Sequence, residues 1–216
     1  MSIIATDVVI EHFREVVGCS KCDQWISKKL LRDSNENIAQ PGWVGNNYEE
    51  HRVLLVGQNP GVPPANMQAR DAIYTAALRQ LESSSSRADY EHLYKVLKSF
   101  VPEWPVQRNY FPLSESGLGL EDIAYCNVVR CRTVGNAAPS NAIVQNCLGH
   151  FDSFAQAVQP KVVIFIGKWA HDRAANRLGE IPYAFMNRMR SLSGIERREN
   201  RSSVINLVRN VIEREI

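Results

Sequence analysis

The chain has 216 residues, of which 44% are hydrophobic and 22% charged, and its formal net charge is +2. This composition excludes a disordered chain, and the length is that of one domain with a large core, so we expect a single domain over 1–216. No apolar run reaches the length of a membrane span, and no membrane partner is expected. A net charge this close to zero does not indicate any particular class of binding partner. However, 187–201 holds five arginines against two glutamates, which fits either a polyanion site or a solvated helix end.

The N-terminal segment carries Glu11, His12 and Arg14 among apolar residues, which is not the pattern of a secretory signal. We therefore expect a cytoplasmic protein, in which disulfides are not expected. The five cysteines are then candidates for metal ligation or for inert burial.

Apolar periodicity predicts the secondary structure in chain order. Helices are expected over 5–17, 25–31, 70–82, 88–100, 140–158 and 168–178, and from the basic segment to 216. Strands are expected over 53–56, 123–129, 161–166 and 182–186. Alternating strands and helices predict an α/β fold with a parallel sheet covered on both faces. Residues 101–119 hold prolines, glycines and aromatic residues, and a loop of this length is usually functional.

The segment 52–61 joins a buried strand to a rigid polar turn. Its apolar run from Val53 to Val56 fits a strand buried on both faces, and Pro60-Gly61 forces a turn. Ligands bind at the carboxyl ends of strands in open α/β sheets, so Gln58 and Asn59 are candidate binding groups. An ordinary strand-to-loop turn is the alternative interpretation.

Four of the cysteines have spacings typical of metal ligands. Cys19 and Cys22 form a C-x2-C pair, and Cys131 and Cys147 follow much later in the chain. A redox C-x-x-C would be expected beside a βαβ unit, whereas this pair precedes the first predicted strand. Four thiolates suit zinc or an iron–sulfur cluster equally by ligand chemistry, although the missing second C-x2-C disfavours a zinc ribbon. Cys126 alternates along a strand and is interpreted as a buried apolar residue.

Three stretches, taken together and in this order, resemble the uracil-DNA glycosylase superfamily, and most closely its iron–sulfur branch, family 4. They are the Cys19–Cys22 pair, Gly57-Gln58-Asn59-Pro60-Gly61, and the run 126–132 (Cys-Asn-Val-Val-Arg-Cys-Arg) followed by Cys147. The resemblance implies a three-layer α/β/α sandwich with a central four-stranded parallel sheet. It also implies a 4Fe-4S cluster held by Cys19, Cys22, Cys131 and Cys147, and DNA as the partner of a monomer.

Two departures from the branch bear on the substrate. The branch usually has Gly-Glu-Gly-Pro-Gly or Gly-Glu-Ala-Pro-Gly in the first motif, where this chain has Gln58 and Asn59. The motif here is more similar to that of the mismatch-specific and single-strand-selective branches, whose Asn positions the attacking water. The second motif, His-Pro-Ser or His-Pro-Ala after the last strand, is missing, and Asn187 is its loose counterpart. The basic segment that follows would enter DNA, with Arg188 and Arg190 on phosphates and Met189 and Leu192 as an apolar wedge; packing of both apolar residues on the core is the alternative.

The resemblance also assigns roles in the pocket for a flipped base. Asn59, Gln58 and Asn187 are the catalytic candidates, and Asn127 resembles the residue that reads the base. Gly57 and Gly61 belong to the same motif and are predicted to line the pocket. Tyr74 and Phe111 are candidates for stacking on the base, although both could equally be core residues.

The sequence leaves two classes of function open. The first is a DNA glycosylase that releases uracil or another deaminated base in DNA repair, or a larger modified pyrimidine in defence against base-modified phage DNA. The second is a catalytically weak iron–sulfur member that binds damaged DNA or senses redox state. The missing His favours the second class, whereas Asn59 and Asn127 favour the first.

Overall fold

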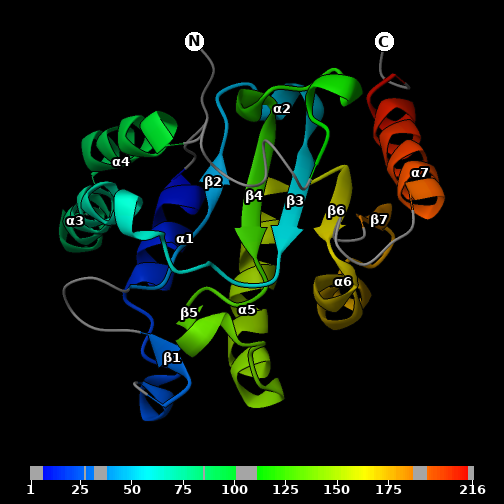
Figure 1. The fold of residues 1–216 in the computed structure, drawn as a ribbon. Coiled ribbons are helices and arrows are strands. Elements are labelled where there is room, and N and C mark those ends of the chain that lie inside the picture. Colours follow the sequence, from blue (N-terminus) through cyan, green and yellow to red (C-terminus); the bar gives the residue numbers. More distant parts are fainter. Residues whose placement is uncertain are drawn as a thin grey trace.

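The computed structural model describes residues 7–26, 28–31, 38–84, 86–100, 111–186 and 194–213. Within them, a five-stranded sheet has the order β2-β4-β3-β6-β7 (Figure 1). Its strands are β2 (Trp43–Val44), β3 (Val53–Gly57), β4 (Ile123–Asn127), β6 (Val162–Ile166) and β7 (Tyr183–Met186). The last four strands are parallel and β2 is antiparallel. The predicted α/β class and its four parallel strands are confirmed, and a short antiparallel edge strand is added.

Helices pack around this sheet. They are α1 (Asp7–Val17), α2 (Tyr48–His51), α3 (Gln68–Ser84), α4 (Arg87–Phe100), α5 (Asn141–Val158), α6 (Lys168–Ala174) and α7 (Gly194–Glu213). α1 contacts both α3 and α5, and α3 pairs with α4, while α6 and α7 pack on β6 and β7 (Figure 1). Short 3-10 helices link several elements: η1 (Asp23–Trp25), η2 (Ala65–Met67), η5 (Ser114–Ser116), η6 (Leu120–Asp122), η7 (Val134–Asn136) and η8 (Ala175–Arg177). No helix in the described ranges is long and apolar enough to cross a bilayer.

The core lies between the helices and the central strands. Each of the five residues of β3 and of β6 is buried, as the continuous apolar runs predicted for strands covered on both faces. Trp43 of β2 closes one edge of the core, because its indole N–H donates to the Leu120 carbonyl at 3.0 Å and its ring stacks on Tyr94 at 4.7 Å. The two residues of β2 are too few to produce a periodic signal, which explains why the sequence predicted no strand there.

The predicted helix over 25–31 is wrong. Only its first residue, Trp25, belongs to a short helix, η1. Its last two residues form β1 (Leu30–Leu31), which pairs antiparallel with β5 (Arg132–Thr133) as a separate two-stranded sheet (Figure 1). Pairing with a segment a hundred residues away overrides the local helical spacing. The predicted final helix is present as α7, and it begins at Gly194, inside the basic segment 187–201.

Candidate functional site at the carboxyl edge of the sheet

The carboxyl ends of β3 and β4 bring the two motif asparagines to the same edge of the sheet. Gly57 and Asn127 are partners in the parallel register, and both strands end at these residues. Beyond them the chains stay paired, because Val128 N–H donates to the Gly57 carbonyl at 2.9 Å and Val129 N–H donates to the Gln58 carbonyl at 3.0 Å. The polar turn after β3 is therefore held rigidly against the end of β4.

Gly57 is required by the close approach of the Asn127 side chain. A Cβ at this position would lie 2.4 Å from Asn127 Oδ1 and 2.7 Å from the Tyr125 hydroxyl oxygen, so a larger residue here would displace these two side chains. Asn127 is only 5% exposed, and its Oδ1 accepts a hydrogen bond from the Tyr125 hydroxyl at 2.9 Å. Tyr125 and Asn127 share a face of β4 because side chains alternate along a strand. That alternation was a usable signal for Tyr125, which the sequence analysis did not single out.

Asn59 is half-buried on the turn after β3, and its amide nitrogen is engaged twice. Nδ2 donates to the Pro60 carbonyl at 3.1 Å and to Thr133 Oγ1 at 3.2 Å. Thr133 belongs to β5, which begins directly after Cys131. No sequence pattern marked Thr133 as a partner of Asn59, since the two residues are 74 positions apart.

Two further contacts clamp the same turn. Arg132 Nε donates to the Gly61 carbonyl at 3.0 Å, and its guanidinium forms a two-bond ion pair with Asp71, with one N–O distance of 2.8 Å. Asn136 Oδ1 accepts a hydrogen bond from the Val62 N–H at 3.0 Å. A buried, bidentate arginine–carboxylate pair is geometrically specific, so the turn after β3 and the segment after Cys131 form one rigid unit.

The two stacking candidates lie in the interior. Tyr74 on α3 is buried, and burial raises the pKa of its hydroxyl, with the Arg132–Asp71 pair nearby. Phe111 is 2% exposed and belongs to the hydrophobic core. In the described structure both positions match the alternative of core residues, and a stacking role would require either ring to become accessible. Their assignment to the base pocket stays a prediction.

Three of the four predicted ligand thiols gather where the N-terminal segment meets β4 and α5. Cys22, Cys131 and Cys147 are buried, and Cys19 is half-exposed. A hydrogen bond to the Cys22 thiol and burial raise the pKa of the Cys147 thiol, and Cys131 adds to this effect. Asn146 ties the first pair to α5, because its amide donates to the Lys21 carbonyl at 2.8 Å and to Cys22 Sγ at 3.6 Å. Among the described residues, no group of three or more potential ligands is already arranged around a metal position.

A buried cation, Arg130, directly precedes the predicted ligand Cys131 in the chain. Arg130 is 1% exposed, and its guanidinium donates to the Pro41 carbonyl at 2.7 Å and the His150 carbonyl at 3.1 Å, while Nε is buried without a partner. No carboxylate pairs with Arg130 in the part of the chain that the structure describes. Burial, reinforced by Arg130, lowers the pKa of His12 to about 2 and that of His150, where Lys21 also contributes, to about 4. The charge of Arg130 acts on the Cys126 thiol, whereas the Cys147 thiol is contacted by the backbone of Arg130.

Five predicted site residues lie outside the described residues: Asn187, Arg188, Met189, Arg190 and Leu192. Their predicted roles stay predictions. Of the basic segment, Arg201 lies on α7, where its guanidinium forms an ion pair with Glu115 and is directed to the protein surface. This arginine therefore matches the alternative of a solvated helix face.

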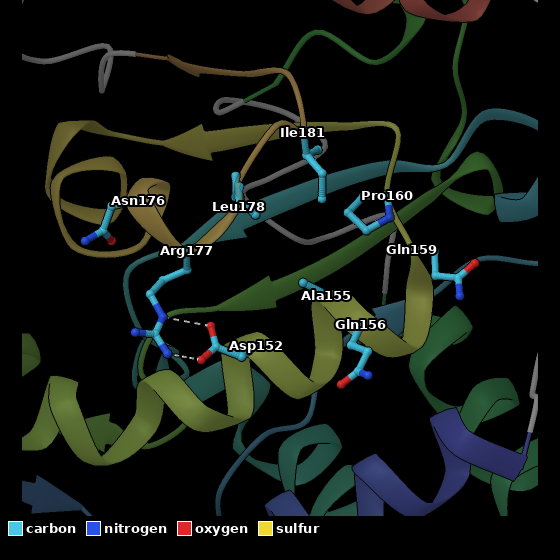
Figure 2. A pocket seen from close by; sticks show the side chains of 9 residues that line it. All are labelled: Asp152, Ala155, Gln156, Gln159, Pro160, Asn176, Arg177, Leu178 and Ile181. Atoms are coloured by element: carbon cyan, nitrogen blue, oxygen red, sulfur yellow. Dashed lines mark hydrogen bonds and ion pairs between the residues drawn. The ribbon is translucent and has the colours of Figure 1, made fainter.

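A hollow of about 640 Å³ lies away from these residues (Figure 2). It is bordered by the end of α5 and by η8, and the ion pair of Asp152 with Arg177 crosses one side of it. Pro160 and Ile181 in its wall precede β6 and β7, so it lies toward the amino ends of these strands. Ligands in open α/β sheets bind at the opposite edge. The paired amides at the carboxyl edge, and not this hollow, define the candidate site.

The fold and this edge define an α/β protein with a site built from amide side chains on rigid turns. The sequence model of the Uracil DNA glycosylase superfamily matches residues 45–208, and the chain belongs to this superfamily. It is also similar to the type-4 uracil-DNA glycosylase of Archaeoglobus fulgidus, with 26% identity over 157 residues, which cover 73% of this chain. The aligned part spans 58% of the length of that relative. The predicted superfamily and the predicted likeness to its family 4 branch are confirmed.

Proposed function

We propose that this protein is a DNA glycosylase, which hydrolyses the N-glycosidic bond of a flipped-out uracil or modified pyrimidine and leaves an abasic site. Membership of the superfamily and the similarity to a type-4 uracil-DNA glycosylase support the class of reaction. The observation that carries the proposal is the register of Gly57 with Asn127, which places two amide-bearing turns at one edge of the sheet. DNA is the partner, and a cytoplasmic monomer is the form we propose.

The two asparagines divide the work in this proposal. Asn127 reads the hydrogen-bonding edge of the base, and the Tyr125 hydroxyl at 2.9 Å holds its amide in place. Asn59 orients the attacking water through its amide oxygen. A neutral amide is a poor base, so the bond to the base breaks first, with positive charge on the sugar, and water attacks late. Donors aimed at the departing base stabilise its negative charge, a role that we assign to backbone N–H groups around Gln58 and to Asn187.

The same proposal includes one 4Fe-4S cluster bound by Cys19, Cys22, Cys131 and Cys147. The hydrogen bond between the Cys22 and Cys147 thiols, with Cys131 beside them, supports it. When bound, the cluster would supply a covalent connection between the N-terminal segment, the end of β4 and α5. A structural metal group of this kind contributes its binding free energy to folding.

Base release from defined oligonucleotides tests the reaction. The purified protein is incubated with single- and double-stranded oligonucleotides that each contain one uracil, one other deaminated base or one enlarged pyrimidine, and abasic sites are revealed by alkaline cleavage. We expect release of at least one of these bases, and no release from the matched unmodified strand. Binding to DNA without abasic sites in any substrate would contradict the proposed reaction and favour the catalytically weak alternative.

We expect the basic segment to supply DNA affinity rather than stability. The double variant Arg188→Ala/Arg190→Ala should weaken DNA binding and reduce the slope of log K against log salt by about 1 to 2, because up to two phosphate contacts are lost. Its melting temperature should stay within about 2 °C of the wild type, because the proposal assigns both side chains to DNA contacts and not to the fold. Fluorescence anisotropy over a salt series measures both the affinity and the slope.

A matched control removes two positive charges elsewhere. Arg87→Ala/Lys95→Ala changes the same net charge on α4, away from the carboxyl edge of the sheet. This control should keep most of the affinity and the full salt slope. If the two double variants behaved alike, the basic segment would have no special role in DNA binding.

A further inference from the structure

The hydrogen bonds of Asn59 determine which way its side-chain amide is turned. The Asn59 amide nitrogen has two N–H groups, and it donates to two acceptors, the Pro60 carbonyl at 3.1 Å and Thr133 Oγ1 at 3.2 Å. A backbone carbonyl can only accept, so the nitrogen and not the oxygen must face it. The amide oxygen Oδ1 is the atom that these two bonds leave for other contacts.

The Thr133 hydroxyl fixes the same orientation independently. A hydroxyl carries one hydrogen, and Thr133 Oγ1 donates it to the Ala137 carbonyl at 2.7 Å. Toward Asn59 it therefore presents only lone pairs, and it can pair with the amide nitrogen but not with the amide oxygen. Thr133 is 2% exposed and its backbone is paired with Leu30 in the small sheet, so no other rotamer is easily reached.

We propose that Thr133 is a positioning residue, which turns the Asn59 amide so that Asn59 acts as an acceptor only. This inference rests on the proposed function, because the acceptor it creates is Oδ1, the atom that would orient the attacking water. It also narrows the role of Asn59: with both N–H groups held by the protein, Asn59 cannot donate to the departing base. Stabilisation of that base then falls to other donors, such as the backbone N–H groups of the turn around Gln58.

The contact also links the site to the cysteines. Thr133 follows the predicted ligand Cys131 by two residues, and neighbouring Arg132 holds the Gly61 carbonyl at 3.0 Å and pairs with Asp71. The segment that orients Asn59 is thus fixed on one side by the cysteine-bearing region and on the other by α3. A displacement of Cys131 would be transmitted to the orientation of Asn59 over two residues of chain.

Thr133→Val tests the inference, because valine keeps the branched shape and the strand propensity but removes the hydroxyl. With substrate bound in excess of Kd, we expect single-turnover base release to fall about five- to tenfold, the scale of one lost hydrogen bond, with little change in DNA affinity. Thr133→Ser retains the hydroxyl and should return the rate to within about threefold of the wild type. A loss of the same size in both variants would indicate a packing role and overturn the proposal.

A double-mutant cycle separates positioning from any independent effect of Thr133. In an Asn59→Ala background, Thr133→Val should cause no further loss of rate, because the side chain that Thr133 orients is already gone. Additive losses would show that Thr133 acts without Asn59, and the inference would be wrong.

A spectroscopic measurement keeps the inference testable apart from the reaction. The side-chain amide signals of Asn59 in a proton–nitrogen correlation spectrum are identified by their absence from Asn59→Ala. In the wild type, and in Thr133→Ser, these hydrogens should exchange slowly with deuterium, whereas Thr133→Val should speed their exchange about tenfold, for a lost bond of about 1.4 kcal/mol. Unchanged exchange would overturn the proposal. Slow exchange in a protein that releases no base would uphold the contact and refute the proposed function alone.

Discussion

Replacing Asn59 by alanine should lower base release by about two to three orders of magnitude, with DNA affinity almost unchanged. This is the usual scale for removing one positioned polar group from a preorganised site. Affinity should persist because phosphate contacts supply most of it. Asn59 is half-buried on the turn after β3, so its side chain contributes little surface for such contacts. Single-turnover kinetics on the best substrate measure the rate, and anisotropy measures binding.

Asn47→Ala is the matched control for this prediction. Asn47 also carries a side-chain amide with one defined partner, Asp122 Oδ1 at 3.0 Å, but it precedes α2 at the other end of β3. The control should keep the wild-type rate. Full activity in Asn59→Ala would mean that the turn after β3 is structural and that the attacking water is oriented elsewhere.

Most of the central sheet could be predicted from the sequence, for a physical reason. Strands buried on both faces need continuous apolar runs, and β3 and β6 have them without interruption. Polar residues that end such strands then gather at the carboxyl edge, and the pairing of Gly57 with Asn127 follows from the parallel register. The location of the candidate site could therefore be predicted from the sequence.

The sequence did not indicate the short strands that hold this site in place. β1, β2 and β5 have two residues each, too few for any periodicity, and each exists because a distant segment offers a partner. The contact of Asn59 with Thr133 is made by one of these strands. The two stacking candidates could not be assigned from the sequence either, because an aromatic residue in a core and one in a base pocket have the same local pattern. The structure shows that Phe111 is buried in the core.

Cys131→Ala should remove the iron and destabilise the fold, whereas Cys126→Ala should do neither to a comparable degree. Anaerobically purified wild type should be brown, with about four irons per chain. Loss of one ligand should release the cluster and lower the free energy of unfolding by about 3–5 kcal/mol, because the connection between the N-terminal segment and the end of β4 is lost. Iron analysis, visible absorption and thermal unfolding measure these effects.

Cys126 is a sharp control because it too is a buried cysteine, five residues earlier on β4, yet its thiol faces Arg130 rather than the other thiols. Its replacement removes the same atom from an equally buried place, so it should cost only about 1 kcal/mol and leave the iron content intact. If both variants lost the same stability, the effect of Cys131 would be packing alone. Colourless wild-type protein with one zinc per chain would instead assign the four thiols to a different metal.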